Sequence, residues 1–470
     1  MRDVTLASAL TIDEVILGTG GRLRTAAVRH DAPLAGVSID SRTIQLGQVF
    51  FAIAGERFDG HDFLAEAAAR GAAAAVVHRD APAPLGLPLV RVDDTTRALG
   101  DLARHWRLAA ALPVVVITGS VGKTTTKDMT AALVALRGPV LKTEGNLNNR
   151  YGLPLTLLRL RPEHTTAVLE LGMSAAGELR ALSAIAQPDI AVITNVAPVH
   201  LEFFASVDAI AEAKAEVLEG LRADGVAVLN GDDPRVRRMG EARKRRIVWF
   251  GRDRRYDVSA DSRRGTPFGM RFELRVGGKT VDVALPLSGP HFVSNFLAAA
   301  AVAHVQGIPP EAMAEVATRL TAARHRGEVR RLGEGITLID DCYNSSPDAL
   351  AAAVVTLGMA PGRRRVAVLG DMLELGPTGP ALHREQGAAL AGTVDVVVAV
   401  GPLAGQFLEG ARSAGLLAEH LHHFADAAAA AAALGTIVEP GDAVLVKGSR
   451  GIRLETVVDA LVRRFPESGS

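Results

Sequence analysis

The sequence VVVITGSVGKTTTKDM, residues 114–129, constrains this chain more than any other stretch. Residues 114–117 form a β-branched apolar run, which is typical of a buried parallel strand. Residues 119–122 (GSVG) interrupt the run, and Lys123 opens a stretch of helix formers. A glycine turn between strand and helix lets backbone N–H groups point at an anion, and the helix N-terminus adds positive potential. We therefore predict a site for a nucleoside triphosphate, with Lys123 on the β- and γ-phosphates and Thr124 on Mg²⁺.

This phosphate loop departs from the common Walker pattern at one position. That pattern has a glycine five residues before the glycine that precedes the lysine, whereas this chain has Ile117 there, inside the predicted strand. The loop is thus the shorter form TGSVGKTT. A glycine turn that binds nothing is the alternative interpretation, but the complete strand, loop and helix context favours phosphate binding.

Length and composition exclude several classes of protein. A chain of 470 residues is too long for one core, and 48% hydrophobic residues are typical of a globular protein. The formal net charge is zero, so no overall field attracts nucleic acid. No apolar run is long enough to span a membrane, and the N-terminus lacks the apolar core of a signal peptide. The single cysteine, Cys342, excludes an internal disulfide and fits a reducing cytoplasm.

The patterns along the chain predict three α/β domains, 1–106, 107–321 and 322–470. In the central one, strand and helix patterns alternate, which predicts a mostly parallel, doubly wound sheet with ligands at the carboxyl ends of its strands. Residues 270–276 and 280–285 around a Gly-Gly pair predict a β-hairpin. The basic segment 235–246 either contacts anions or is a solvated surface, and its interrupting Glu and Met favour the surface.

Further motifs resemble a known family. In order, ITGSVGKTTTK, TEGNLNNRYGLP, ELGMSAAGEL, ITNVAPVHLEFFAS and AKAEVL resemble the central domain of the Mur ligases, which build the peptide of bacterial cell-wall precursors. SIDSR and GERFDGHDF before them, and GPHFVSNFLAAAAVA, IDDCYNSSP, VLGDMLELG and VLVKGSRGIRLE after them, extend the resemblance over nearly the whole chain. The last motifs look like the family member that takes D-alanyl-D-alanine, and the DNPR motif of the diaminopimelate-adding relative is absent.

This resemblance implies a three-domain fold: a UDP-binding N-terminal domain, a central ATP-binding domain and a Rossmann-like C-terminal domain. It implies ATP and Mg²⁺ as cofactors, and UDP-N-acetylmuramoyl tripeptide and D-alanyl-D-alanine as substrates, joined through an acyl phosphate. We expect a cytoplasmic monomer that neither binds nucleic acid nor inserts into membranes.

The resemblance also implies roles for individual residues. The residues implied in ATP binding are Gly119, Ser120, Val121, Gly122, Lys123, Thr124, Thr125, Asn295, Arg326 and Asp341. The implied metal ligands are Thr124, Glu170, His200 and Lys214, and the implied catalytic residues are Lys123, His200 and Lys214. The residues implied in substrate binding are Ser41, Arg42, Asn146, Asn149, Tyr343, Asn344 and Lys447.

Several of these residues are unremarkable by themselves. Lys214 alone reads as a surface lysine, His200 as a capping or surface residue, and Ser41-Arg42 as a solvated turn. Lys214 matches a lysine that the family often carbamylates, which turns a cation into a metal-binding carboxylate. Where the family commonly has Tyr-Asn-Ala-Asn-Pro, this chain has Ser346 in place of the second asparagine.

Other interpretations stay open at this point. Cys342 lies beside Asp341, but the predicted chemistry needs no nucleophile there, so a small buried residue is the better interpretation. A folylpolyglutamate-synthase-like enzyme or another Mur ligase would share the fold, although the SIDSR and GERFDGHD motifs argue against a folate substrate. A P-loop ATPase that switches conformation would belong to another class, and it leaves His200 and Lys214 without a role.

Overall fold

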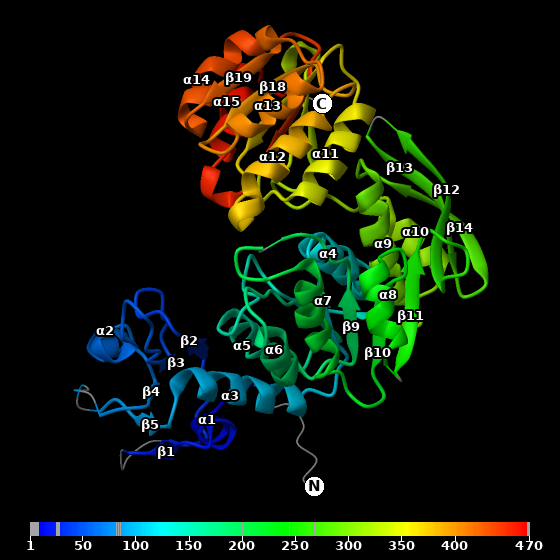
Figure 1. Cartoon of the computed structure of the whole chain (residues 1–470). Helices are drawn as coiled ribbons and strands as arrows, with labels where there is room; N and C mark the ends of the chain where they lie inside the picture. Colours follow the sequence, from blue (N-terminus) through cyan, green and yellow to red (C-terminus); the bar gives the residue numbers. More distant parts are fainter. Residues whose placement is uncertain are drawn as a thin grey trace. The chain divides into compact units, whose positions relative to one another are not determined.

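The computed structural model describes residues 9–24, 29–80, 82, 84, 86–199, 201–243, 245–266 and 268–467. The chain is α/β, with strands in five-, nine- and six-stranded sheets (Figure 1). It divides into two compact units. The first consists of Met1–Thr118, Val134–Val192 and Ala215–Ala227, and the second of Gly119–Leu133, Ile193–Lys214 and Val228–Ser470.

The five-stranded sheet has the order β1-β5-β4-β3-β2. Its strands are β1 (Arg22–Leu23), β2 (Gly36–Ser38), β3 (Gln48–Phe51), β4 (Ala74–Val77) and β5 (Leu89–Arg91). The four strands β2 to β5 pair in parallel, and β1 adds to β5 in the antiparallel sense. Phe50, Ala75 and Val77 pack with Leu64 of α2 (Leu64–Ala69) in a small core.

The nine-stranded sheet has the order β14-β13-β12-β11-β10-β9-β6-β8-β7. Its strands are β6 (Val114–Thr118), β7 (Val140–Lys142), β8 (Thr166–Glu170), β9 (Ile190–Ile193), β10 (Val226–Asn230), β11 (Arg246–Gly251), β12 (Val258–Thr266), β13 (Gly269–Val276) and β14 (Lys279–Leu285). Every residue of β6 and β8 is buried, as expected of apolar strands covered on both faces. The pairs β6–β8 and β7–β8 are parallel, and β13–β14 is the predicted hairpin, here confirmed.

The six-stranded sheet has the order β15-β16-β20-β17-β18-β19. Its strands are β15 (Glu328–Arg331), β16 (Thr337–Asp340), β17 (Arg365–Gly370), β18 (Val396–Val400), β19 (Leu421–Phe424) and β20 (Ala443–Lys447). Successive side chains of a strand point to opposite faces. Val366 and Val368 therefore join one core cluster, while Ala367 and Leu369 join the other. Both faces are apolar, so helices cover both of them.

The structure has the following α-helices. They are α1 (Ile12–Thr19), α2, α3 (Thr95–Ala109), α4 (Lys123–Val134), α5 (Gly152–Leu157), α6 (Glu178–Ala186), α7 (Val207–Ala215), α8 (Pro234–Glu241), α9 (Pro290–Val305), α10 (Pro310–Ala317), α11 (Pro347–Met359), α12 (Gly379–Ala388), α13 (Gly405–Ser413), α14 (Ala427–Ile437) and α15 (Glu455–Arg464). Within the described residues, none of them combines the length and the apolar character that a membrane crossing requires.

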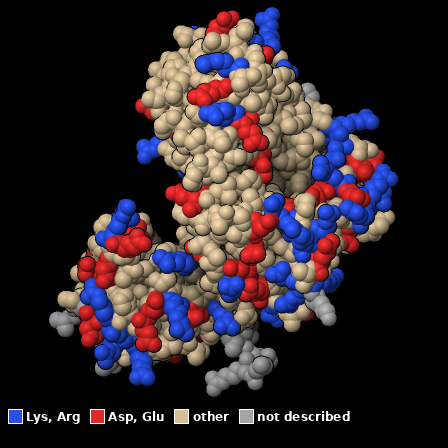
Figure 2. Space-filling model, viewed as in Figure 1, with Lys and Arg blue, Asp and Glu red and all other residues tan. Residues whose placement is uncertain are grey.

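The basic segment 235–246 lies mainly in α8 and at the start of β11. Arg235 and Arg238 both approach the Asp208 carboxylate, at 2.7 and 3.5 Å. Figure 2 shows positive and negative side chains interspersed over the visible face. These ion pairs fit the solvated surface that the interrupted charge pattern favours.

Candidate nucleotide-binding site

The predicted phosphate loop joins β6 to α4 and is held by the chain that follows β9. Asn195 Oδ1 accepts the Val121 N–H at 2.9 Å, and Thr194 Oγ1 donates to the Val121 carbonyl at 2.7 Å. The Ser120 N–H donates to the Asn195 carbonyl at 3.0 Å. Contacts within the protein thus fix the shape of the loop. Asn195 is one of the polar residues that the sequence places at the carboxyl ends of strands, but neither Asn195 nor Thr194 is assigned a role there.

Two glycines of the loop have conformations and neighbours that other residues could not match. Gly119 has φ of 151° and Gly122 has φ of 85°. A Cβ on Gly119 would clash with the Thr194 hydroxyl, and one on Gly122 would clash with the Asn295 side chain. Asn295 lies in the first turns of α9 and is buried at 8% exposure. The structure therefore brings Asn295 against the phosphate loop.

Lys123, the predicted phosphate ligand, folds back onto its own loop. Its Nζ donates to the carbonyls of Gly119 at 2.9 Å and Ser120 at 3.2 Å. Thr124 is buried and Thr125 half-buried, both in the first turn of α4, whose N-terminus attracts anions. A hydroxyl in this turn is a hard oxygen donor of the kind that Mg²⁺ prefers.

Lys214 is not on the surface, in contrast to what its helical context alone suggests. It lies in the last turn of α7 and is 2% exposed. Burial, together with the positive charge of Lys123, lowers the pKa of its amine well below the ordinary value. A neutral buried amine is a nucleophile, which is what carbamylation requires. His200, predicted beside it as a metal ligand, lies outside the described residues.

Glu170, the predicted carboxylate ligand, ends β8 and is 3% exposed. Asn148 Nδ2 donates to Glu170 Oε1 at 2.8 Å. The backbone N–H of Glu170 donates to the buried Thr143 hydroxyl at 3.0 Å. Asn148 lies between Asn146 and Asn149, the two residues chosen from the same motif, and sequence reasoning missed it. The contact of Asn148 with Glu170 could not be read from the run of asparagines.

Asn146 and Asn149 are both exposed. Asn149 Oδ1 accepts the backbone N–H groups of Tyr151 and Gly152, at 3.1 and 3.0 Å, and so supports the start of α5. The role of Asn146 and Asn149 on a substrate-lining loop stays a prediction.

Five residues predicted for the ATP and dipeptide sites lie in the C-terminal sheet and its loops, and they contact one another in two groups. Lys447 Nζ donates to Asp341 Oδ2 at 2.6 Å and to the Asn344 carbonyl at 3.0 Å. The guanidinium of Arg326 stacks on the Tyr343 ring, 4.0 Å from its centre.

Ser346 is 7% exposed and directly precedes α11, without a side-chain capping bond. Burial and the neighbouring carboxylates raise the pKa of the Cys342 thiol, which fits a buried residue and not a nucleophile.

The loops after β17 and β20 lie against each other. Gly370 and Gly448 approach so closely that a Cβ on Gly448 would be 3.0 Å from the Gly370 Cα. The Leu373 N–H donates to the Ser449 hydroxyl at 2.9 Å. His383, fully buried, accepts the Met372 N–H at Nε2, 2.9 Å away. These contacts join the LGDMLELG and KGSR motifs into one rigid edge.

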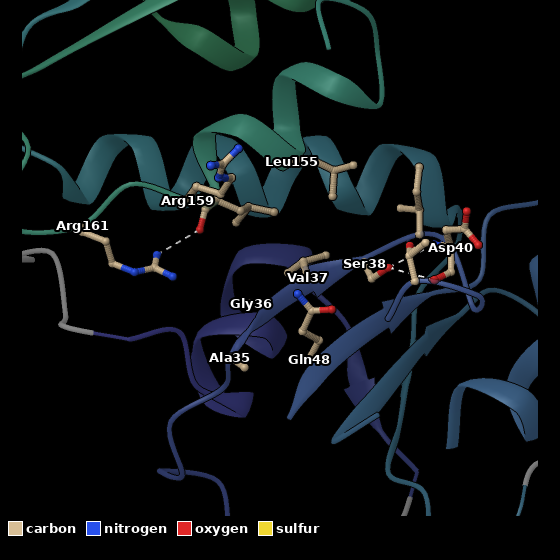
Figure 3. A pocket seen from close by; sticks show the side chains of 12 residues that line it. Ala35, Gly36, Val37, Ser38, Asp40, Gln48, Leu155, Arg159 and Arg161 are labelled. Carbon is tan, nitrogen blue, oxygen red and sulfur yellow. Dashed lines mark hydrogen bonds between the residues drawn. The ribbon is translucent and has the colours of Figure 1, made fainter. Parts of the chain in front are cut away.

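A cavity of about 400 Å³ lies in the first unit, between the turn after β2 and the end of α5 (Figure 3). Its lining includes Ser38, Asp40, Gln48, Arg159 and Arg161. Arginine side chains and backbone groups of this kind suit a phosphate or a nucleobase edge.

Ser41 and Arg42 do not line this cavity. Ser41 is buried and donates to Glu66 at 2.9 Å, and the exposed Arg42 holds Asp40 with two bonds of 2.9 and 2.7 Å. These bonds lower the pKa of Asp40 to about 2. Asp40 therefore meets the cavity as a carboxylate, already paired with Arg42.

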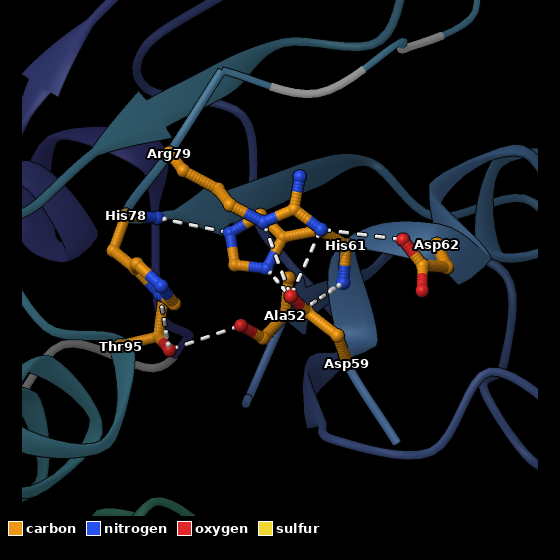
Figure 4. A network of polar contacts seen from close by, with 7 residues as sticks. All are labelled: Ala52, Asp59, His61, Asp62, His78, Arg79 and Thr95. Carbon is orange, nitrogen blue, oxygen red and sulfur yellow. Dashed lines mark hydrogen bonds and ion pairs between the residues drawn. The ribbon is translucent and has the colours of Figure 1, made fainter. Parts of the chain in front are cut away.

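The GERFDGHDF motif forms a second polar network in the first unit (Figure 4). His61 is buried, with Nδ1 2.6 Å from Asp59 Oδ1, and its Nε2 accepts the His78 N–H at 3.1 Å. Arg79 donates to the other oxygen of Asp59 at 3.1 and 2.9 Å. Because both ring nitrogens of His61 are used, this network is a structural clamp between the motif and the end of β4.

Comparison with known proteins places these features in a family. The Mur ligase middle domain matches residues 117–303, the Mur ligase glutamate ligase domain matches 325–450, and the Mur ligase family catalytic domain matches 33–107. The chain is 38% identical over 458 residues to the UDP-N-acetylmuramoyl-tripeptide--D-alanyl-D-alanine ligase of Escherichia coli, covering 96% of this chain and 98% of that one.

Solved structures give the same result. The crystal structure of MurF from Acinetobacter baumannii superimposes with a TM-score of 0.90 at 34% identity, covering 98% of this chain and 100% of that one. MurF ligase from Thermotoga maritima, solved in complex with ADP, superimposes with a TM-score of 0.81 at 31% identity, covering 91% and 97%. The similarity thus covers all three sheets.

Proposed function

The chain belongs to the Mur ligase family, and on this premise we propose that it is an ATP-dependent ligase that joins D-alanyl-D-alanine to UDP-N-acetylmuramoyl tripeptide. The observation that carries the proposal is the match along nearly the entire length to ligases of that name. The preformed phosphate loop supports the use of ATP, and so does the ADP-bound relative.

The reaction needs an activated carboxyl group, because hydroxide is a poor leaving group. The terminal carboxylate of the tripeptide attacks the γ-phosphorus of ATP, ADP leaves, and an acyl phosphate forms. The free amine of D-alanyl-D-alanine then attacks the acyl carbon, and inorganic phosphate leaves as the amide forms. Lys123 would leave the carbonyls of Gly119 and Ser120 and stabilise the charge on the transferring phosphoryl group.

Mg²⁺ fits the residues that we propose as its ligands. The Thr124 hydroxyl and the Glu170 carboxylate are oxygen donors, which Mg²⁺ prefers, and the ion would supply neutralising charge to the phosphates. Lys214 would join this set only after its amine has attacked CO₂, forming a carbamate and releasing a proton. The burial that lowers its amine pKa supports this modification. We propose His200 as a further ligand on the strength of the family resemblance alone.

The remaining predicted residues have proposed roles in binding. Asn295, beside the phosphate loop, would contact the adenine, and Arg326 and Asp341 would close over ATP. Tyr343, Asn344 and Lys447 would surround the dipeptide, and Asn146 and Asn149 would line the path of the tripeptide. Ser41 and Arg42 would act on the UDP end indirectly, since Arg42 orients Asp40 at the cavity.

We propose domain boundaries at 1–106, 107–321 and 322–470, a cytoplasmic location and a monomeric state. This division gives the UDP end, ATP and the dipeptide one domain each. The absence of a membrane-crossing helix among the described residues is compatible with this location.

The decisive experiment measures phosphate release from ATP and Mg²⁺ with UDP-N-acetylmuramoyl tripeptide, with and without D-alanyl-D-alanine. We expect release that requires both substrates, and a nucleotide-sugar product heavier by the dipeptide less one water. Release that is indifferent to both would support a switching ATPase and contradict the ligase. Release that needs the tripeptide but a different amine would move the function to another Mur ligase.

A further inference from the structure

Three side chains with different donor atoms converge where the C-terminal sheet begins. They are His325, in the segment before β15, and Asp340 and Cys342, at the end of β16. One potential ligand atom from each lies within 4.8 Å of the other two. His325 Nδ1 and Asp340 Oδ2 are 2.8 Å apart. None of the three has a part in the proposed ligase reaction.

The backbone holds these side chains in place. His325 has φ of 62°, a left-handed conformation that is unfavourable for a residue with a Cβ. Its carbonyl accepts the Tyr343 N–H at 3.0 Å, and the Gly327 N–H donates to the Asp340 carbonyl at 2.9 Å. The segment around His325 is thus paired with the end of β16 on both sides of the cluster. These backbone hydrogen bonds hold the segments that carry the three donor atoms close together.

The cluster is shielded from solvent and is rich in negative charge. Asp340 and Cys342 are 0% and 1% exposed, and the His325 side chain is 12% exposed. The carboxylates of Asp340, Asp341 and Glu455 all act on the Cys342 thiol. Glu455 Oε2 is also buried without a hydrogen-bond partner. Lys447 pairs with Asp341 and Arg450 with Glu455, so a bound cation would offset mainly the negative charge of Asp340.

We propose that His325, Asp340 and Cys342 form a binding site for a divalent cation of the zinc class. An imidazole nitrogen, a carboxylate oxygen and a thiolate are the donor set that Zn²⁺ prefers, and water would complete four-coordination. Mg²⁺ prefers oxygen donors throughout, so this site differs in kind from the one proposed for the ATP-bound ion.

Binding would replace the hydrogen bond between His325 Nδ1 and Asp340 Oδ2 by bonds to the metal. The Cys342 thiol would release one proton to solvent as its sulfur binds, and the neutral His325 ring would carry its proton on Nε2 while Nδ1 binds the ion. The ion would tie the segment before β15 to the end of β16. Arg326 and Asp341, which adjoin two of the ligands, would lose freedom to rearrange. An occupied site would therefore restrain the residues that we propose to close over ATP.

The test is a titration of the full-length, chelator-treated protein with Co²⁺, which gives zinc-type sites a visible spectrum. Cys342 is the only cysteine in the chain, so a thiolate-to-cobalt charge-transfer band has one possible source. We expect that band at one ion per chain, release of a proton, persistence in excess Mg²⁺, and loss of the band when Zn²⁺ is added.

Variants distinguish the site from adventitious binding by surface histidines. Cys342→Ser should abolish the band, and His325→Asn should weaken Co²⁺ binding by at least about tenfold. His422→Asn, on the half-buried strand β19, is the matched control and should leave the titration unchanged. Circular dichroism and thermal unfolding would verify that each variant is folded.

Two results would overturn the proposal. One is a wild-type titration without a charge-transfer band, and the other is a band that folded His325→Asn retains at unchanged affinity. Neither readout depends on ligase activity, so failure here leaves the proposed function intact, and failure of the ligase assay leaves the metal site intact.

Discussion

Asn148 Nδ2 donates a hydrogen bond to Glu170 Oε1 over 2.8 Å, so the carboxylate at the end of β8 has a fixed neutral partner. One oxygen of Glu170 is oriented by an amide that carries no charge and does not compete for a metal. This is the arrangement expected of a carboxylate whose orientation matters, since outer partners position metal ligands.

Replacing Asn148 by alanine should therefore weaken the response to Mg²⁺ and leave the fold in place. We expect the Mg²⁺ concentration for half-maximal activity to rise by about 10- to 100-fold, because the carboxylate loses its orienting donor. The measurement is activity against Mg²⁺ at saturating ATP. Asn146→Ala, at an exposed position of the same motif, serves as the control and should leave this Mg²⁺ dependence unchanged. Equal shifts in both variants would contradict an orienting role for Asn148.

Gly122→Ala should abolish nucleotide binding, because the new methyl group would meet the Asn295 side chain at a φ of 85°. Gly307→Ala is the matched control, since Gly307 has φ of 76° and nothing within 4 Å of its Cβ position. Both variants should lose roughly 1–2 kcal/mol of stability from backbone strain. Only Gly122→Ala should lose ATP binding in calorimetry. Normal binding by folded Gly122→Ala would show that this loop does not hold the phosphates as we propose.

The buried amine of Lys214 should make stability depend on pH. Its pKa in the folded chain is well below the ordinary 10.5, so the unfolded state binds more protons between those two values. The free energy of unfolding should therefore rise with pH across that window and level off near the ordinary pKa. Lys214→Met, which keeps the volume without the charge, should remove this rise. The measurement is urea unfolding in buffers free of CO₂, and an unchanged pH slope in Lys214→Met would contradict the assignment.

A second pH effect should come from His383, whose pKa burial lowers. Its Nε2 accepts the Met372 N–H and its Nδ1 lies 2.7 Å from the Gly379 carbonyl, so the neutral ring is the form that fits. The unfolded state takes up the proton first, and stability should fall as the pH drops below about 6.5. Asp371, which also acts on this ring, opposes the effect without reversing it.

His383→Gln should flatten this acid-side slope. It should also cost about 1–3 kcal/mol at neutral pH, where one of the two buried hydrogen bonds is lost. Urea unfolding at several pH values checks both expectations. A slope that persists in His383→Gln would assign the acid effect to other histidines, such as His291, whose pKa burial lowers to about 4.

Strands and helices with a regular pattern could be predicted from the sequence, because periodicity reports which face is buried. The run 114–117 and the hairpin strands are of this kind, and β6, β13 and β14 confirm them. The short strand β1 and the strand β11 were missed. Two residues are too few to show a period, and β11 begins at the last residue of the basic segment with only a short apolar run, IVWF, to mark it.

The contacts of individual side chains were harder to predict than the helices and strands that carry them. The close approach of Gly122 to Asn295 joins residues far apart in the chain, and the resemblance to a family placed both in one site. Asn148 was missed, because an asparagine that orients a neighbour looks like any polar residue in a loop. The strand-end position of Asn195 marked it as a candidate without giving it a role. Lys214 shows the reverse case: its sequence context indicates a surface residue, and only packing reveals that it is buried.

Lys123 can donate to carbonyls of its own loop, and this affects how ADP leaves. When the nucleotide departs, the ammonium group can return to the carbonyls of Gly119 and Ser120. The positive charge of Lys123 is therefore not left without a hydrogen-bond partner. The same exchange reduces the net gain of binding, because each new bond to phosphate replaces an existing one. Departure of the nucleotide therefore costs this loop less than it would cost a loop whose lysine had no other partner.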